Sequence, residues 1–257
     1  LEGDAVSRYG AAWTHRVAIL VDKMTAGVAA VDVTAVVPAD LEEFWDNVQA
    51  DGDDVRGTDA DGIALEVYDL AAGFSVATRT CAIEVQAAVP PLADSMFVLW
   101  LYFGNAAAAD AKTVFAPASA RTGYIYPGMP LGPIYRAGRE EPGATKPRQR
   151  YAMTTKEISM PWIDFGGALA MRSEPYEGRR LYEEISYVWQ AVYNAQGSDN
   201  GGVYNETLMR ICDQGLVRGH LSAFAVGSDF TLSVVVGTTL GRIVNPRILV
   251  QSRDPLG

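Results

Sequence analysis

The chain has 257 residues, 49% of them hydrophobic, so it can bury the core of one large domain or two ordinary ones, and disorder throughout is not expected. Its net charge of −10 repels phosphate backbones and argues against direct nucleic-acid binding. No stretch approaches the ~20 apolar residues of a membrane span, and we expect neither a membrane span nor a signal peptide.

The charge is unevenly distributed along the chain. Residues 1–112 hold 18 acidic and 6 basic side chains, whereas residues 113–257 hold 13 and 15. Such a difference would help identical copies to pack head to tail, although a solvated acidic domain is the simpler explanation.

Residues 1–115 predict an antiparallel β-sandwich of jelly-roll type, rich in β-branched and aromatic residues. Strands are expected at residues 16–22, 31–37, 63–68, 79–86 and 96–103. In the fourth of these, Cys81, Ile83 and Val85 alternate with polar residues, which indicates a half-buried strand. The 96–103 run is apolar on both faces, as expected of a central strand that is covered on each side.

A small helical insertion is expected at residues 39–49 of this sandwich. Asp40 is the expected N-cap, and Glu43 completes a capping box, in which two side chains satisfy backbone N–H groups reciprocally.

Residues 116–150 differ in character from the sandwich and are expected to form an extended arm or linker. They contain six prolines, which remove backbone donors and fix φ. Its part from residue 136 to residue 150 carries five basic residues, Arg136, Arg139, Lys146, Arg148 and Arg150. These would either dock on an acidic neighbour, such as residues 1–112 of another copy, or belong to a flexible linker that needs no partner.

Residues 151–257 are expected to form a second β-rich domain, or a second sheet that completes the first. Strands are expected at residues 151–160, 167–172, 185–193, 221–226, 230–236 and 243–251. A short helix is expected near residues 203–213.

Four motifs follow one another in the first 115 residues. They are Trp13-x-x-Arg16-x-x-Ile19, then Asp54-Val55-Arg56 with Asp59-Ala-Asp61-Gly62, then Ile83-x-Val85, then Tyr102-Phe103-Gly104-Asn105. Their order and spacing resemble a family of uncharacterised β-sandwich modules of microbial surface proteins and tailed-phage virion proteins. The resemblance implies a sandwich fold and no established catalytic residues, and on physical grounds the motifs describe strand ends and turns.

The acidic residues of the second motif are the only metal candidates. Asp51, Asp53, Asp54, Asp59 and Asp61 could supply oxygen ligands to calcium, although a capped, solvated turn is the simpler explanation. An EF-hand loop is excluded, because aligning Gly62 with its glycine places Gly57 at the first ligand position. No other cofactor is expected.

An aromatic stretch in the second half is the candidate carbohydrate contact. It contains Tyr176, Tyr182, Tyr187 and Trp189, which suit either core packing or stacking against sugar rings. Glu183 and Glu184 are adjacent and would point to opposite faces of a strand, so they are a poor catalytic pair for glycoside hydrolysis.

No catalytic arrangement is recognisable elsewhere. The two histidines, His15 and His220, lie in no nucleophile motif, and Cys81 and Cys212 are expected to be buried thiols, with a single bridge as the alternative. We therefore do not expect an enzyme.

The leading hypothesis is a structural protein of a virus particle, such as a tailed-phage capsid decoration, tail or fibre component, that contacts other virion proteins and copies of itself. The alternative is a carbohydrate-binding or adhesin module of an extracellular or cell-surface protein, with surface glycan as its partner.

Overall fold

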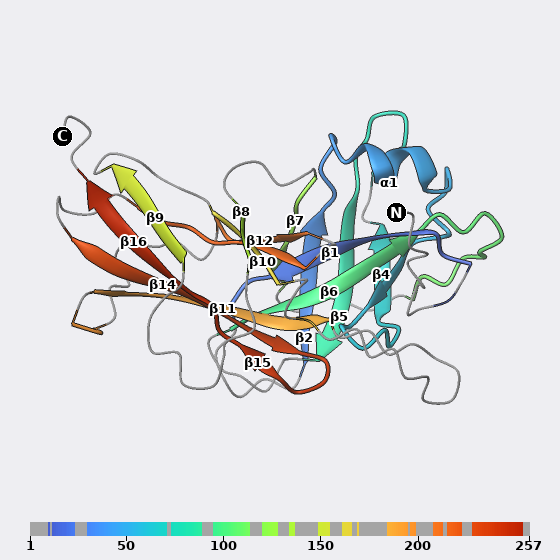
Figure 1. Ribbon diagram of the computed structural model, residues 1–257. Coiled ribbons are helices and arrows are strands. Elements are labelled where there is room, and N and C mark those ends of the chain that lie inside the picture. Colours follow the sequence, from blue (N-terminus) through green and yellow to red (C-terminus); the bar gives the residue numbers. More distant parts are fainter. Residues whose placement is uncertain are drawn as a thin grey trace. The chain divides into compact units, whose positions relative to one another are not determined.

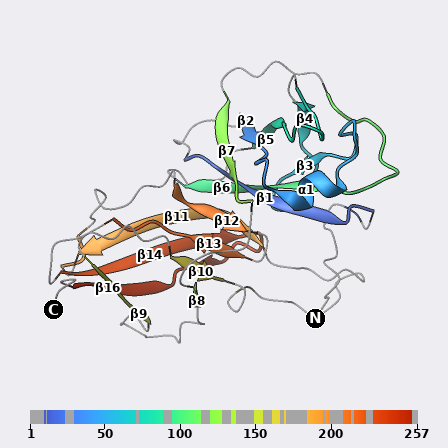
Figure 2. The same cartoon turned by 90° about the horizontal axis from the view of Figure 1, so that it is seen from above.

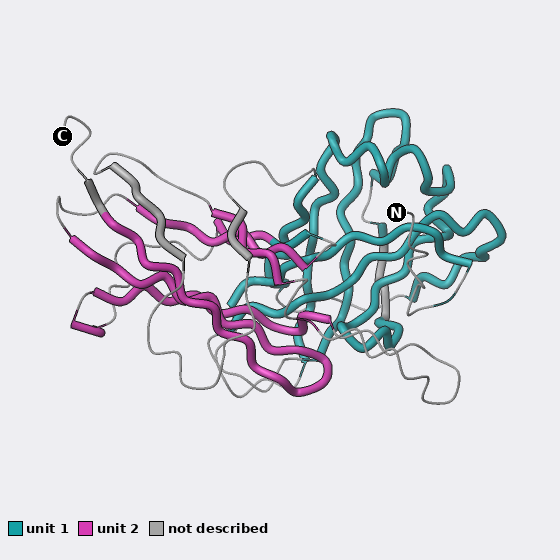
Figure 3. Tube along the Cα trace, viewed as in Figure 1, with its two compact units in different colours: residues 1–129, 211–213 teal, residues 130–210, 214–257 magenta. Residues whose placement is uncertain are grey.

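A computed structural model describes most of the chain. The described residues are 10, 12–23, 30–70, 73–88, 95–113, 120–127, 134–136, 149–154, 161–165, 169, 184–194, 196–198, 208–212, 215–222 and 228–253. They form β-strands and one short helix, which confirms the all-β class (Figure 1). The chain divides into two compact units, residues 1–129 with 211–213 and residues 130–210 with 214–257 (Figure 3). Among the described residues, no helix is long and apolar enough to cross a membrane.

The first unit contains one mixed sheet. Its strands are β1 (His15–Val21), β2 (Ala30–Val36), β3 (Arg56–Thr58), β4 (Glu66–Leu70), β5 (Ala82–Ala88), β6 (Met96–Phe103) and β7 (Arg121–Ile125). They lie in the order β4-β5-β2-β7-β1-β6, and β3 pairs with the other edge of β6. All pairs are antiparallel except β2 and β7, which run parallel.

The burial of this sheet follows the predicted patterns. Every residue of β6 is buried, as the apolar run predicts. In β5, Ile83 and Val85 are buried and alternate with more exposed neighbours. Cys81 is buried and Cys212 half-buried, and neither forms a disulfide. The β-branched and aromatic side chains thus fill a core on which the rest of the unit is built.

Strand β7 lies inside the segment predicted to be an arm. It pairs with β1 and β2, so residues 121–125 belong to the sheet of the first unit. Prolines flank these residues at positions 117 and 127 but do not interrupt them. Gly123 is needed here, because a Cβ would lie 2.6 Å from Ile19 Cγ2. The prolines of the segment did not indicate this strand, because all of them lie outside residues 121–125.

Helix α1 (Glu42–Asn47) is the predicted insertion, but its capping was predicted wrongly. The N-cap is Leu41, and no side chain caps the helix. The helix begins two residues beyond Asp40, which contributes its backbone carbonyl to Glu42 N. Buried Phe44 and Trp45 hold the helix in place, with the Phe44 ring 5.0 Å from that of Phe103.

The second unit contains two groups of paired strands. Its strands are β8 (Ile134–Arg136), β9 (Gln149–Thr154), β10 (Trp162–Asp164), β11 (Ile185–Asn194), β13 (Leu216–Arg218), β14 (Asp229–Thr238), β15 (Ile243–Val244) and β16 (Arg247–Arg253). The larger sheet has the order β11-β14-β16-β9, with β15 also paired to β14, and the smaller has the order β13-β10-β8. Figure 2 shows β11, β14 and β16 side by side.

The prediction of a helix near residues 203–213 is wrong for the part of this segment that the structure describes. Residues 210–212 form strand β12 (Arg210–Cys212). The predicted strand at 167–172, apart from residue 169, and most of the one at 221–226 lie outside the described residues.

Candidate functional site

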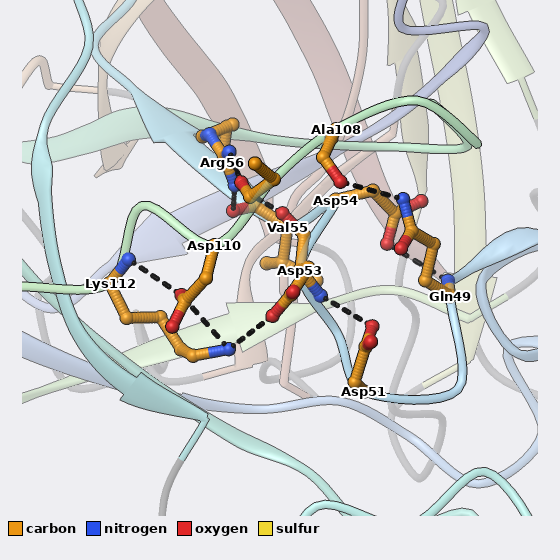
Figure 4. A network of polar contacts seen from close by, with 10 residues as sticks. Gln49, Asp51, Asp53, Asp54, Val55, Arg56, Ala108, Asp110 and Lys112 are labelled. Atoms are coloured by element: carbon orange, nitrogen blue, oxygen red, sulfur yellow. Dashed lines mark hydrogen bonds and ion pairs between the residues drawn. The ribbon is translucent and has the colours of Figure 1, made fainter.

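Three of the four sequence motifs, all except Ile83-x-Val85, contribute residues around one buried carboxylate, Asp54 (Figure 4). Asp54 has no exposed surface. Its Oδ1 accepts a hydrogen bond from Gln49 N at 2.9 Å, and its Oδ2 accepts from Gly104 N at 2.7 Å and Asn105 N at 3.2 Å. The carboxylate therefore ties the end of β6 to the loop before β3. A buried carboxylate is stabilised in this way by several backbone N–H donors.

Trp13 and Arg56 complete this cluster. The Trp13 indole donates to the Asp54 carbonyl at 3.1 Å, and the Arg56 guanidinium lies 5.6 Å from the Trp13 ring centroid. Arg56 also donates to the carbonyls of Asp53 and Ala109, at 2.7 and 2.6 Å. Residues that are widely separated in sequence thus form one polar network, whose bonds go to backbone groups. The network holds these loops together.

The five calcium candidates, Asp51, Asp53, Asp54, Asp59 and Asp61, do not form a common site. Asp51 Oδ1 accepts from Asp53 N at 3.1 Å, while Asp59 Oδ1 accepts from Asp61 N at 2.9 Å and Ile63 N at 2.8 Å. These are local Asx-type turns. Within the described ranges, no three His, Cys, Asp or Glu residues are grouped so that they could hold a metal ion.

Lys112 neutralises the carboxylates at the edge of this cluster. Its Nζ lies 2.9 Å from Asp53 Oδ1 and 3.2 Å from Asp110 Oδ1. Burial acts to lower the pKa of Lys112, but hydrogen bonds to the two carboxylates outweigh it and raise the pKa. Hydrogen bonds from the Lys112 backbone and ammonium lower the pKa of Asp110. The loop thus carries its own cation.

The basic residues predicted as an interaction surface are only partly described. Arg136 ends β8 and Arg150 lies in β9, whereas Arg139, Lys146 and Arg148 lie outside the described residues. Their interaction with an acidic partner stays a prediction.

The aromatic stretch is also partly described. Tyr176 and Tyr182 lie outside the described residues, whereas Tyr187 and Trp189 lie on β11. Both are half-buried and share one face of the strand, because they are two residues apart.

A groove crosses β11, β14 and β16 on this same face of the second unit, with a volume of about 480 Å³. Its lining consists of Tyr193, Asn194, Gly197, Asp229, Thr231, Ser233, Asn245, Arg247 and Leu249. The strand register places Tyr193, Thr231 and Leu249 in one row across the three strands. Ser233 and Arg247 form the next row.

The opposite face of these strands explains why this face is polar. It carries the apolar residues that alternate with the groove residues, and they are buried: Val188, Val192, Phe230, Leu232, Val234, Ile248 and Val250. Period-two alternation thus sends hydrophobic side chains to the core and leaves polar ones on the other face.

The groove offers hydrogen-bonding groups of both kinds. Ser233 donates to Asn245 Oδ1 at 2.6 Å, and Gln251 donates to Asp229 Oδ1 at 3.4 Å. The Arg247 side chain makes no hydrogen bond or ion pair to any residue that the structure describes, and its exposed guanidinium presents donors to the groove. The groove thus combines one aromatic ring with several hydrogen-bonding side chains.

A turn at the end of β11 forms one wall of this groove. Asn194 Oδ1 accepts from Gln196 N at 3.0 Å and Ser198 N at 2.9 Å, and Gly197 has a φ of 80°. The Asn194 side chain and the glycine therefore fix the turn locally.

The two histidines are outside the groove. His15 stacks on Phe103, with ring centroids 5.5 Å apart, and its Nδ1 lies 2.7 Å from Thr14 Oγ1. His220 is buried, and its backbone exchanges two hydrogen bonds with the Gln190 side chain, at 2.8 and 3.0 Å. Burial, together with the charge of Arg218, lowers the pKa of His220.

No protein-family model and no curated protein matches this chain. Among solved structures, the chain is similar to SporoSAG from Toxoplasma gondii, at 11% identity and a TM-score of 0.25, covering 90% of this chain and 96% of that one. It is also similar to the Enterococcus faecalis MSCRAMM ACE, at 9% identity and a TM-score of 0.15, covering 93% and 89%. TM-scores of this size do not indicate a shared fold, so function has to be argued from the groove.

Proposed function

We propose that this protein is a glycan-binding β-protein that holds a sugar in the groove across β11, β14 and β16 and does not cleave it. One observation carries the proposal: the groove combines the Tyr193 ring with polar side chains from three adjacent strands. A sugar ring has an apolar C–H face and an edge of hydroxyl groups. Such a ligand uses an aromatic surface and hydrogen-bond partners at the same time.

The charges of the groove support binding without hydrolysis. Asp229 is the one carboxylate among the lining residues, whereas most glycosidases place two carboxylates on either side of the scissile bond. Arg247 and Asp229 together also leave the groove without a strong net charge. Hydroxyl-rich ligands suit this balance better than polyanions.

The sequence resemblance suggests where such binding would operate. Virion proteins of tailed phages and microbial surface proteins both meet the glycans of a cell surface. We place the protein in a virus particle as a fibre or other receptor-facing component, with a cell-surface adhesin as the alternative. The groove serves either setting. Particle proteomics decides between them, since a virion component must be recovered from purified particles.

A glycan array tests the binding itself. We expect the full chain to bind a defined set of glycans, and Tyr193→Ala to reduce that binding by about tenfold or more, because it removes the stacking surface. Tyr124→Ala is the matched control, because Tyr124 is a half-buried tyrosine of the first unit. Incubation of any bound glycan should release no new reducing ends. A blank array, or equal binding by Tyr193→Ala, would refute the proposal.

A further inference from the structure

Beyond the groove, β11 carries two further aromatic residues on the same face as Tyr193. Tyr187, Trp189 and Tyr193 are separated by even numbers of residues, so they share the strand face that forms the groove. All three are half-buried, whereas Val188 and Val192, which point to the other face, have no exposed surface. The aromatic residues are therefore not part of the core beneath the sheet.

Gly237 allows Tyr187 to lie flat on the neighbouring strand. The two residues are register partners between β11 and β14. A Cβ at position 237 would lie 1.9 Å from Cε1 and from Cζ of the Tyr187 ring, so the ring occupies the space of the missing side chain. A ring that covers a strand glycine presents its outer face away from the sheet.

The spacing of these rings sets the size of the ligand. Trp189 and Tyr193 are four residues apart on an extended strand, which is roughly 13 Å. This distance is longer than one sugar ring. A monosaccharide in the groove would therefore leave Trp189 and Tyr187 without a contact.

We infer that the site takes an oligosaccharide chain laid along β11, with one subsite in the groove at Tyr193 and a second on the platform formed by Trp189 and Tyr187. The inference rests on the proposed glycan-binding function. It names the ligand class, a linear oligosaccharide, and assigns Trp189 and Tyr187 to recognition of chain length. Stacking on the platform supplies contact area, while hydrogen bonds in the groove select the sugar.

The test compares short and long oligosaccharides on the full chain. The probes are chito-, cello- and malto-oligomers, each as a dimer and a hexamer, measured by calorimetry. We expect at least one hexamer to bind about tenfold more tightly than its dimer, and Trp189→Ala to remove this difference by lowering the hexamer affinity. Trp189→Phe, which keeps a ring, should retain most of the hexamer affinity and guards against a folding defect in Trp189→Ala.

Tryptophan fluorescence supplies a second readout. Trp45, Trp100 and Trp162 are at most 3% exposed, so acrylamide quenching in the native protein reports mainly on the half-buried Trp13 and Trp189. The hexamer should protect the wild type from quenching, and this protection should be absent in Trp189→Phe. The dimer should give little protection in either protein.

Each outcome decides a different question. If dimer and hexamer bind equally, and only Tyr193→Ala weakens them, the inference of an extended site is wrong but the glycan-binding proposal stands. If none of the oligomers binds and the array is also blank, both are overturned. If a hexamer binds better but Trp189 stays open to acrylamide, the chain does not lie on this platform and the inference fails.

Discussion

Replacement of Asp54 tests whether the sequence motifs of the first unit serve structure. Asp54→Ala removes a fully buried carboxylate that accepts three backbone N–H groups, from Gln49, Gly104 and Asn105. A hydrogen bond to a charged group is worth about 1.5–3 kcal/mol, and an orphaned buried donor costs about 1–3 kcal/mol. Because water can enter the space left behind, we expect a loss of about 4 kcal/mol in the free energy of unfolding, less than the simple sum.

Two further variants calibrate this value. Asp54→Asn keeps one acceptor oxygen but places an NH₂ group against backbone donors, so we expect about half the loss, roughly 2 kcal/mol. Asp51→Ala is the control, since Asp51 lies in the same loop but is exposed and accepts a single local bond from Asp53 N. It should cost less than about 1 kcal/mol.

Urea unfolding followed by fluorescence gives the free energies, and amide hydrogen exchange localises the effect. The Gly104 and Asn105 amides should be protected in the wild type and exchange much faster in Asp54→Ala. An Asp54→Ala protein that loses under about 1 kcal/mol, with these amides still protected, would refute the structural role of the motif. The motif residues would then have to be explained by a binding function.

Three other predictions concern pH and packing. Burial near a positive charge lowers the pKa of His220, so the unfolded chain binds more protons than the folded one at mildly acidic pH. The free energy of unfolding should therefore fall as pH drops below about 6.5. In urea unfolding at several pH values, His220→Gln should flatten this slope. The Lys112–Asp110 pair should not make the free energy of unfolding depend on pH between pH 5 and 9. The raised pKa of Lys112 affects stability only above about pH 10.5, and the lowered pKa of Asp110 only below about pH 3.8. A pH dependence in this window that Lys112→Met abolishes would contradict this. Gly123→Ala should cost about 1–3 kcal/mol by thermal or urea unfolding, because its Cβ would press on Ile19 in the middle of the sheet; an unchanged stability would show that the sheet relaxes at no cost.

The sequence predicted the strands whose burial can be read from the pattern of polar and apolar residues within a few positions. The apolar run of β6 and the alternation around Ile83 in β5 each encode burial within a few residues. The sequence did not predict strand β7, because its five residues lie between prolines and its place in the sheet depends on partners far away in sequence. The capping box failed at Asp40 because buried Phe44 and Trp45, rather than a cap, determine where α1 lies.

The candidate groove was predictable only in part. Tyr193 lies four residues after Trp189, the last residue of the predicted aromatic stretch, but Asp229 and Arg247 come from segments with no local motif. They meet Tyr193 because antiparallel pairing of β11 with β14 and of β14 with β16 sets a common register. Since register is decided by the buried face of all three strands, a single sequence carries no direct signal for it.

In the second unit, the residues that line the groove and the residues that align the strands lie on opposite faces of the sheet. The residues that determine the register, such as Leu232 and Val234, point to the core, while Thr231 and Ser233 on the same strand face the groove. Substitution of a groove residue therefore removes a ligand contact and leaves the apolar face that aligns the strands. A substitution in the core that shifts the strands would move all the groove residues away from one another. Under the glycan-binding function that we propose, substitutions of Tyr193 and its polar neighbours would change the glycan that the groove selects without changing the fold.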